Sequence, residues 1–142
     1  MRTKVAMTFR ALFALAAAAA VAVGATACSG SNPGSAEAAV AATMFHDDVR
    51  SGDVEAACGL LAPGTVEELE EGEPGSCAIK LREVDLRATS SVLESEAYGS
   101  DAQVVLDEDT VFLVQSGQNW KITAAGCTSR GERPYDCLID GS

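Results

Sequence analysis

The sequence predicts an α+β fold in which helices from the first half of the chain pack on a four-stranded antiparallel sheet from the second half. The first half, residues 37–87, has apolar positions at helical spacing, and glycine or proline divides it into pieces. The second half consists of short runs rich in β-branched residues, and hairpin-sized gaps separate these runs.

The first helix is predicted over residues 37–53. Val40, Met44 and Phe45 fall on one of its faces, so we expect these three side chains to form the apolar contact. The Ser-Gly pair that ends at Gly52 terminates the helix.

Three shorter helices are predicted to follow. Asp53 is a typical N-cap residue for the second helix. Thr65, with Glu68 three residues later, is a capping-box signature that predicts the third. Residues 77–86 predict a fourth helix, although the alternation within this stretch also fits a strand. Its candidate apolar contacts are Ile79, Val84 and Leu86.

Four strands are predicted after Arg87, and neighbours along the chain are expected to pair as a meander. The strand-like runs cover residues 91–99, 101–107, 110–115 and 119–126. Because no internal repeat or second linker is visible, residues 37–142 are predicted to form a single α+β domain. Residues 28–36 are small, polar and turn-forming, which predicts a flexible tether before that domain.

Residues 1–27 have the features of a secretory signal peptide, with basic residues first, then an uncharged apolar run, then small residues. The small residues lead directly to Cys28 and resemble the bacterial lipobox, although Ala25 stands where leucine is usual. The resemblance implies cleavage before Cys28 and lipidation of its sulfur, so the expected location is the outer face of the cell membrane. Two alternatives stay open: an uncleaved membrane helix over residues 11–27, and ordinary secretion.

The charge of the chain limits the classes of partner. Removal of the leader takes three of the ten basic residues and leaves seven against 21 acidic residues, a formal charge of −14. Such a chain repels phosphate backbones and anionic lipid headgroups, so nucleic-acid binding is not expected. Membrane association is therefore expected to come from the lipid on Cys28, since each buried methylene contributes about 0.8 kcal/mol.

The cysteine count is consistent with this location. Of the five cysteines, Cys28 is assigned to the lipid, which leaves four for two disulfides outside the cytoplasm. Three pairings are possible, and we favour the pairing of sequence neighbours. The four cysteines are Cys58, Cys77, Cys127 and Cys137. A single histidine and the absence of a CxxC spacing argue against zinc and redox chemistry, so no metal or cofactor is expected.

Several stretches of the mature chain resemble a group of small lipoproteins from high-GC Gram-positive bacteria that carry an NTF2-like (cystatin-like) domain. The matching positions are Phe45, Asp48, Gly52, Asp53, Ala57, Cys58, Leu60, Leu61, Pro63, Cys77, Asp85, Leu86 and residues 110–113, 120–127 and 134–137. The likeness covers residues 37–140. It implies helices laid across a curved antiparallel sheet, and it implies little about activity.

NTF2-like enzymes such as ketosteroid isomerases place Asp, His or Tyr inside a conical pocket, and on this resemblance His46 and Tyr98 are possible pocket residues. The residues alone favour a plainer interpretation, in which His46 is a surface side chain beside two acids and Tyr98 belongs to an edge or the core. The acidic run at residues 67–73 is interpreted as a solvated helix face, since it lacks the ligand pattern of a calcium loop.

Two functions from different classes follow from these observations. The first is a membrane-anchored, non-catalytic binding or accessory domain that uses its sheet or its acidic surface for an unknown protein or small-molecule partner. The second is an extracytoplasmic enzyme or small-ligand carrier with an NTF2-like pocket. The lipid anchor and the lack of a recognisable catalytic set favour the first.

Overall fold

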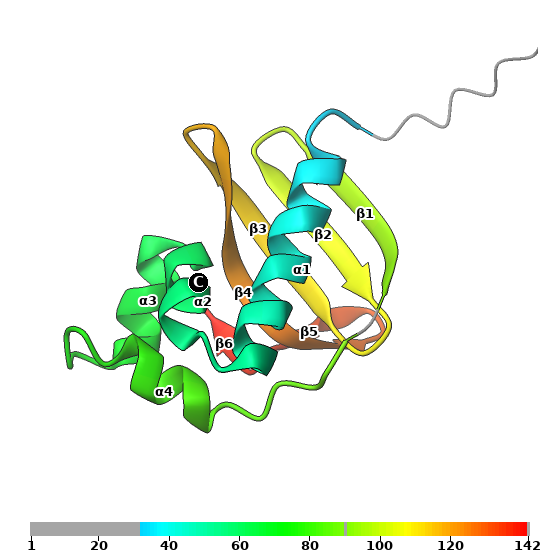
Figure 1. Ribbon diagram of the computed structural model, residues 1–142. Helices are drawn as coiled ribbons and strands as arrows, with labels where there is room; N and C mark the ends of the chain where they lie inside the picture. The colour runs from blue at the N-terminus through cyan, green and yellow to red at the C-terminus, as the bar shows by residue number, and fades with distance from the viewer. Residues whose placement is uncertain (1–31, 90, 142) are drawn as a thin grey trace, which may run out of the picture.

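A computed structural model describes residues 32–89 and 91–141 (Figure 1). The predicted leader, its cleavage site and the lipidation of Cys28 lie outside these residues. The described helices are α1 (Ser35–Ser51), α2 (Val54–Leu60), α3 (Pro63–Glu70) and α4 (Cys77–Glu83). The described strands are β1 (Val92–Tyr98), β2 (Asp101–Leu106), β3 (Thr110–Ser116), β4 (Asn119–Arg130), β5 (Arg133–Asp136) and β6 (Ile139–Asp140).

The predicted α+β class and antiparallel sheet are confirmed, but the sheet has more than four strands. Within the described residues the strand order is β1-β2-β3-β4-β5, and β6 pairs with β4 beside this path. All of these pairs are antiparallel, and the first four strands follow one another as a meander. The two added strands are only four and two residues long, which is too short for a hydrophobic alternation to develop in the sequence.

Helix α1 crosses one face of the sheet and contacts β1, β2 and β4 (Figure 1). It begins at Ser35, two residues before the expected start of the domain. Phe45 is fully buried as predicted, but Val40 and Met44 are 58% and 49% exposed, so their predicted contact is wrong. Apart from Phe45 and His46, the buried face consists of small residues that let the helix lie close to the strands: Ser35, Ala38, Ala41 and Ala42.

The core lies between the sheet and the helices, with side chains from α1, α2 and α4. Its largest fully buried side chains are Phe45, Leu81, Leu113, Ile122, Ile139, Val54, Val104 and Val111. At the start of α1, Gly34 adopts a φ of 93°, and a Cβ there would lie 2.9 Å from the Trp120 ring. Glycine therefore allows the chain to turn into α1 directly against this tryptophan.

The short helices agree only in part with the prediction. Asp53 caps α2 as expected, and its carboxylate accepts a hydrogen bond from the Ala56 amide at 3.3 Å. The capping box is wrong: α3 already begins at Pro63, and the buried Thr65 hydroxyl donates to a carbonyl of β4. In α4, Ile79 is 59% exposed, and the predicted contact is replaced by buried Cys77 and Leu81.

The favoured disulfide pairing is confirmed. Cys58–Cys77 joins α2 to α4, and Cys127–Cys137 joins β4 to the segment between β5 and β6. Both bridges close short loops, with sequence separations of 19 and 10. Disulfides persist mainly outside the reducing cytosol, so these two indicate an extracytoplasmic protein.

Candidate functional site

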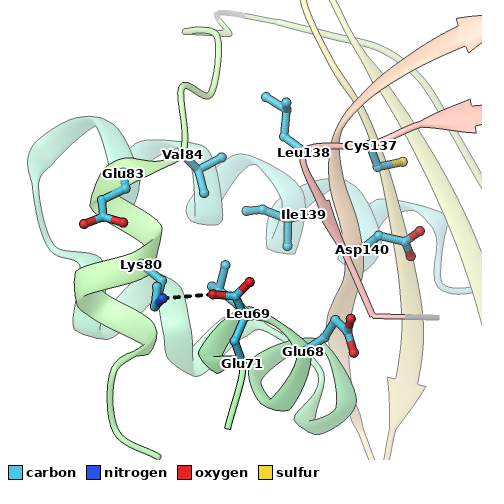
Figure 2. Close-up of a pocket in the computed structure, with 10 residues that line it drawn as sticks. All are labelled: Glu68, Leu69, Glu71, Lys80, Glu83, Val84, Cys137, Leu138, Ile139 and Asp140. Atoms are coloured by element: carbon cyan, nitrogen blue, oxygen red, sulfur yellow. Dashed lines mark hydrogen bonds and ion pairs between the residues drawn. The ribbon is translucent and has the colours of Figure 1, made fainter. Parts of the chain in front are cut away.

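A groove of about 420 Å³ opens between α3, α4 and the C-terminal strand β6 (Figure 2). Its floor is apolar and consists of Leu69, Val84, Leu138 and Ile139. Charged side chains stand around this floor, and they are Glu68, Glu71, Lys80, Glu83 and Asp140. The volume falls within the range of about 300–1,000 Å³ that ligand sites usually occupy. We call this feature the acidic groove.

The α3 side of the acidic groove is fixed to the sheet by polar contacts of the backbone. The Ala62 amide donates to the Ile122 carbonyl at 2.7 Å, so the entrance of α3 is bonded to β4. The fully buried Thr65 hydroxyl and the Gly141 amide both donate to the Thr123 carbonyl, at 3.1 and 2.9 Å. A Cβ at Gly141 would lie 2.2 Å from the Thr65 hydroxyl, so only glycine allows the tail to pass there.

The two disulfides hold the other sides of the acidic groove. Cys58–Cys77 ties α4 to α2, and so fixes the helix that carries Lys80 and Glu83. Cys127–Cys137 turns the chain back beside β4, where β6 places Ile139 opposite Ala125. Because the bridges hold α4 and the segment before β6, which both line the acidic groove, its shape depends on oxidised cysteines.

The loop between α3 and α4 is ordered by one of the acids that the sequence places on a solvated face. The Glu70 carboxylate accepts hydrogen bonds from the amides of Gly75 and Cys77, at 2.8 and 3.2 Å. This contact leads the chain from the end of α3 into α4. The interpretation of the acidic run as an open helix face is therefore wrong for Glu70, whereas Glu68 and Glu71 are exposed.

The acidic groove has a strongly negative electrostatic balance. Its lining contains four carboxylates and one ammonium group, that of Lys80, which gives a formal charge of −3. Lys80 Nζ lies 2.9 Å from a Glu71 carboxylate oxygen and 3.9 Å from one of Glu73. The hydrogen bond and charge of Glu71, followed by Glu73 and Glu83, raise the pKa of Lys80 above its usual 10.5. Lys80 therefore stays protonated, and Glu68, Glu83 and Asp140 have no ion-pair partner among the described residues.

A second hollow of about 330 Å³ continues the acidic groove, since Cys137 and Leu138 line both. It adds the carboxylates of Asp85, Glu108 and Asp136 and one cation, Arg87, which lies 3.6 Å from Glu108. The Leu138 side chain is 56% exposed and stands between the two hollows. The arrangement can therefore bind a ligand that is both basic and apolar over an extended length.

His46 does not lie on the surface, in contrast to the plainer interpretation of the sequence. It is 6% exposed, and its Nε2 lies 2.8 Å from the carboxylate of the buried Asp109. The same carboxylate accepts hydrogen bonds from the amides of Gly126 and Cys127, at 2.9 and 2.7 Å. Asp109 thus joins α1, the β2–β3 turn and β4 through one side chain.

The space beside His46 is small. His46 borders a cavity of about 100 Å³ between the C-terminal half of α1 and residues 86–89. This volume is well below the lower end of the usual range for ligand sites, about 300 Å³. The His46–Asp109 pair therefore acts as a tie between helix and sheet in this geometry.

Tyr98 does not join His46. Its side chain is 58% exposed at the end of β1, and its hydroxyl donates to the neighbouring Glu96 carboxylate. Tyr98 pairs with Asp101 at one end of β2, whereas Asp109 follows the other end of that strand. The two residues that the NTF2-like resemblance nominated thus lie apart in the sheet.

Two further features of the described residues bear on metal binding and on membrane insertion. No group of three or more His, Cys, Asp or Glu side chains within residues 32–89 and 91–141 is placed to hold a metal ion. In the same part of the chain, no helix has the length and hydropathy needed to cross a bilayer.

Sequence reasoning missed three features of the site. Asp109 is separated from His46 by 63 positions, and its place in a short turn gave no signal beyond turn chemistry. The sequence analysis predicts no strand at β6, because two residues are too few to show a period. The sequence shows Glu68 and Glu83 as acidic positions. It does not show that both line one groove with an apolar floor.

Comparison of the chain with protein-family models, with curated proteins and with solved structures finds no match in any of the three.

Proposed function

We propose that this protein is a lipid-anchored lipoprotein of the outer face of the cell membrane whose domain binds a partner and has no catalytic role. The acidic groove is the proposed binding surface, and its chemistry calls for a basic amphipathic segment of a partner protein. The observation that carries the proposal is the combination of an apolar floor with carboxylates that have no cation of their own.

The floor of the acidic groove supplies the apolar part of this binding. Leu138 is 56% exposed, and Ile139 beside it is buried at the base. Covering the exposed part of Leu138 yields about 25 cal/mol per Å² of apolar surface, which gives affinity without directionality. The carboxylates then select for charge and accelerate the encounter with a cation.

The lipid anchor rests on the small residues that precede Cys28 and on the disulfides, which support an extracytoplasmic location. Lipidation is tested in cells that express the full chain. We expect globomycin to cause a larger precursor to accumulate, and Cys28→Ala to release the mature domain from membranes. A chain that is processed equally with and without globomycin contradicts the lipid anchor.

Partner chemistry is tested by calorimetric titration of the mature domain with an amphipathic lysine- and leucine-containing peptide. We expect binding that weakens as salt is added, because exposed charge pairs are screened over about 10 Å at 0.1 M. The combined substitution Glu68→Lys and Glu83→Lys is expected to abolish binding of this peptide. The corresponding glutamate- and leucine-containing peptide should not bind the unsubstituted domain.

The matched control changes the same number of charges elsewhere. Glu37 and Glu132 are exposed and border neither the acidic groove nor its extension. The combined substitution Glu37→Lys and Glu132→Lys should weaken binding only slightly. Equal losses in both double variants would show that overall charge, and not the acidic groove, attracts the peptide.

A small-ligand carrier or enzyme based on the NTF2-like resemblance is the second candidate. The buried His46 beside a carboxylate is the observation in its favour, because a carboxylate can orient imidazole for proton transfer. The cavity of about 100 Å³ and the distant Tyr98 argue against it. Binding of a drug-sized ligand that is lost in His46→Gln with an unchanged fold would favour this candidate instead.

A further inference from the structure

Another groove, which helix α1 borders, differs from the acidic groove and its extension in its chemistry. Val40 and Met44 lie one turn apart on α1 and are 58% and 49% exposed. Together with Leu60 of α2 and Trp120 of β4 they line a groove of about 320 Å³. We call this feature the α1 groove. Single exposed apolar residues are ordinary, but here two neighbours continue into an apolar hollow.

The charge of the α1 groove also sets it apart. Its lining contains one acid, Glu37, and one base, Lys121, so its formal charge is zero. The acidic groove has a formal charge of −3, and its extension adds further acids. A negatively charged surface such as an anionic bilayer therefore repels the acidic groove, whereas it exerts no net repulsion on the α1 groove.

The position of the α1 groove relative to the tether supplies the third observation. Helix α1 begins at Ser35, seven positions after Cys28, and seven extended residues span at most about 25 Å. Val40 follows five residues later, which is about 7.5 Å further along the helix axis. In Figure 1 the chain enters α1 at the end of the molecule that is farthest from α4.

We propose that the α1 groove rests on the membrane surface, with Val40 and Met44 in contact with the boundary between headgroups and acyl chains of the bilayer. This inference rests on the lipid anchor of the proposed function. It gives the molecule a fixed orientation, in which the acidic groove between α3, α4 and β6 faces away from the membrane and is open to a soluble basic partner.

The test uses the full-length protein, isolated with its lipid and reconstituted into vesicles of phosphatidylcholine and phosphatidylglycerol. A nitroxide is attached at Val40→Cys, and in a second protein at Ile79→Cys. Ile79 is a matched control, because it is also β-branched, helical and 59% exposed, but it belongs to α4 at the far end. Collision of each nitroxide with oxygen and with a water-soluble nickel complex is measured by power saturation.

We expect the nitroxide at residue 40 to lose collisions with nickel and gain collisions with oxygen when vesicles are added, while residue 79 keeps its solution values. Equal nickel accessibility at both residues in floated vesicles overturns the orientation and leaves the anchor intact. Loss of both kinds of collision at residue 40 also overturns it, since protein and not lipid would then cover the groove. A protein that does not float with vesicles contradicts the anchor itself.

Discussion

At the scale of single residues, Asp109 is the side chain that joins α1, the β2–β3 turn and β4. It accepts three hydrogen bonds, from His46 Nε2 and from the amides of Gly126 and Cys127. Its carboxylate is almost fully withdrawn from solvent, so water cannot replace a lost partner. The neighbouring Glu108 differs, because it is exposed and forms only a long ion pair with Arg87.

Asp109→Ala is therefore expected to lower the free energy of unfolding by about 3–5 kcal/mol, because three donors, two of them in buried hydrogen bonds, lose their acceptor. Denaturation in urea measures this change. Glu108→Ala serves as control and should change stability by less than about 1 kcal/mol. Similar values for both variants would mean that the pair with His46 is not a structural tie.

Replacing either of two glycines by alanine is expected to change the stability of the domain, in opposite directions at the two positions. Gly126 has a φ of 68°, and a Cβ there would lie 2.8 Å from Leu138 and 2.9 Å from Leu86. Gly126→Ala is expected to destabilise the domain by at least about 1–2 kcal/mol, since the left-handed conformation alone costs that much. Gly59 in α2 has open space around it and no positive φ, so Gly59→Ala should stabilise by up to about 1 kcal/mol. Thermal unfolding of both variants distinguishes them, and a shared sign would contradict these backbone geometries.

At the scale of elements, the sequence predicts the sheet better than the contacts of the helices. The first four strands follow from β-branched runs with glycine between them, and each begins within one residue of its expected position. In α1 the prediction is wrong for Val40 and Met44, because pattern reasoning favours large side chains, whereas beside Phe45 the helix buries alanines against the strands. Thr65 likewise suits a cap by type, but its hydroxyl bonds a strand 58 positions away.

Among the elements of the fold, removal of a disulfide is expected to have the largest joint effect on stability and binding. In the entropy model, closing loops of these lengths raises the free energy of the unfolded chain by about 3.3 kcal/mol for Cys58–Cys77 and about 2.8 kcal/mol for Cys127–Cys137. The paired serine variants should each lower the melting temperature clearly. Each should also weaken peptide binding, because α4 and β6 both border the acidic groove. An unchanged melting temperature in either variant would show that its bridge does not support the domain.

At the scale of the whole molecule, the fold separates two surfaces of different character. The neutral α1 groove lies beside the start of the described chain, and the acidic groove lies among α3, α4 and β6. The overall negative charge was evident from composition, but its gathering around an apolar floor was not. That convergence depends on two disulfides and on a two-residue strand, which are properties of the folded chain.

The most direct test of the proposed binding surface is mapping of backbone amide chemical shifts in the isotope-labelled mature domain during titration with the basic amphipathic peptide. We predict that the largest shifts fall on α3, α4 and the segment from Cys137 to Asp140, with small changes in β1 and β2. Shifts centred on β1, or spread evenly over all exposed carboxylates, would contradict the assignment of the acidic groove as the binding site.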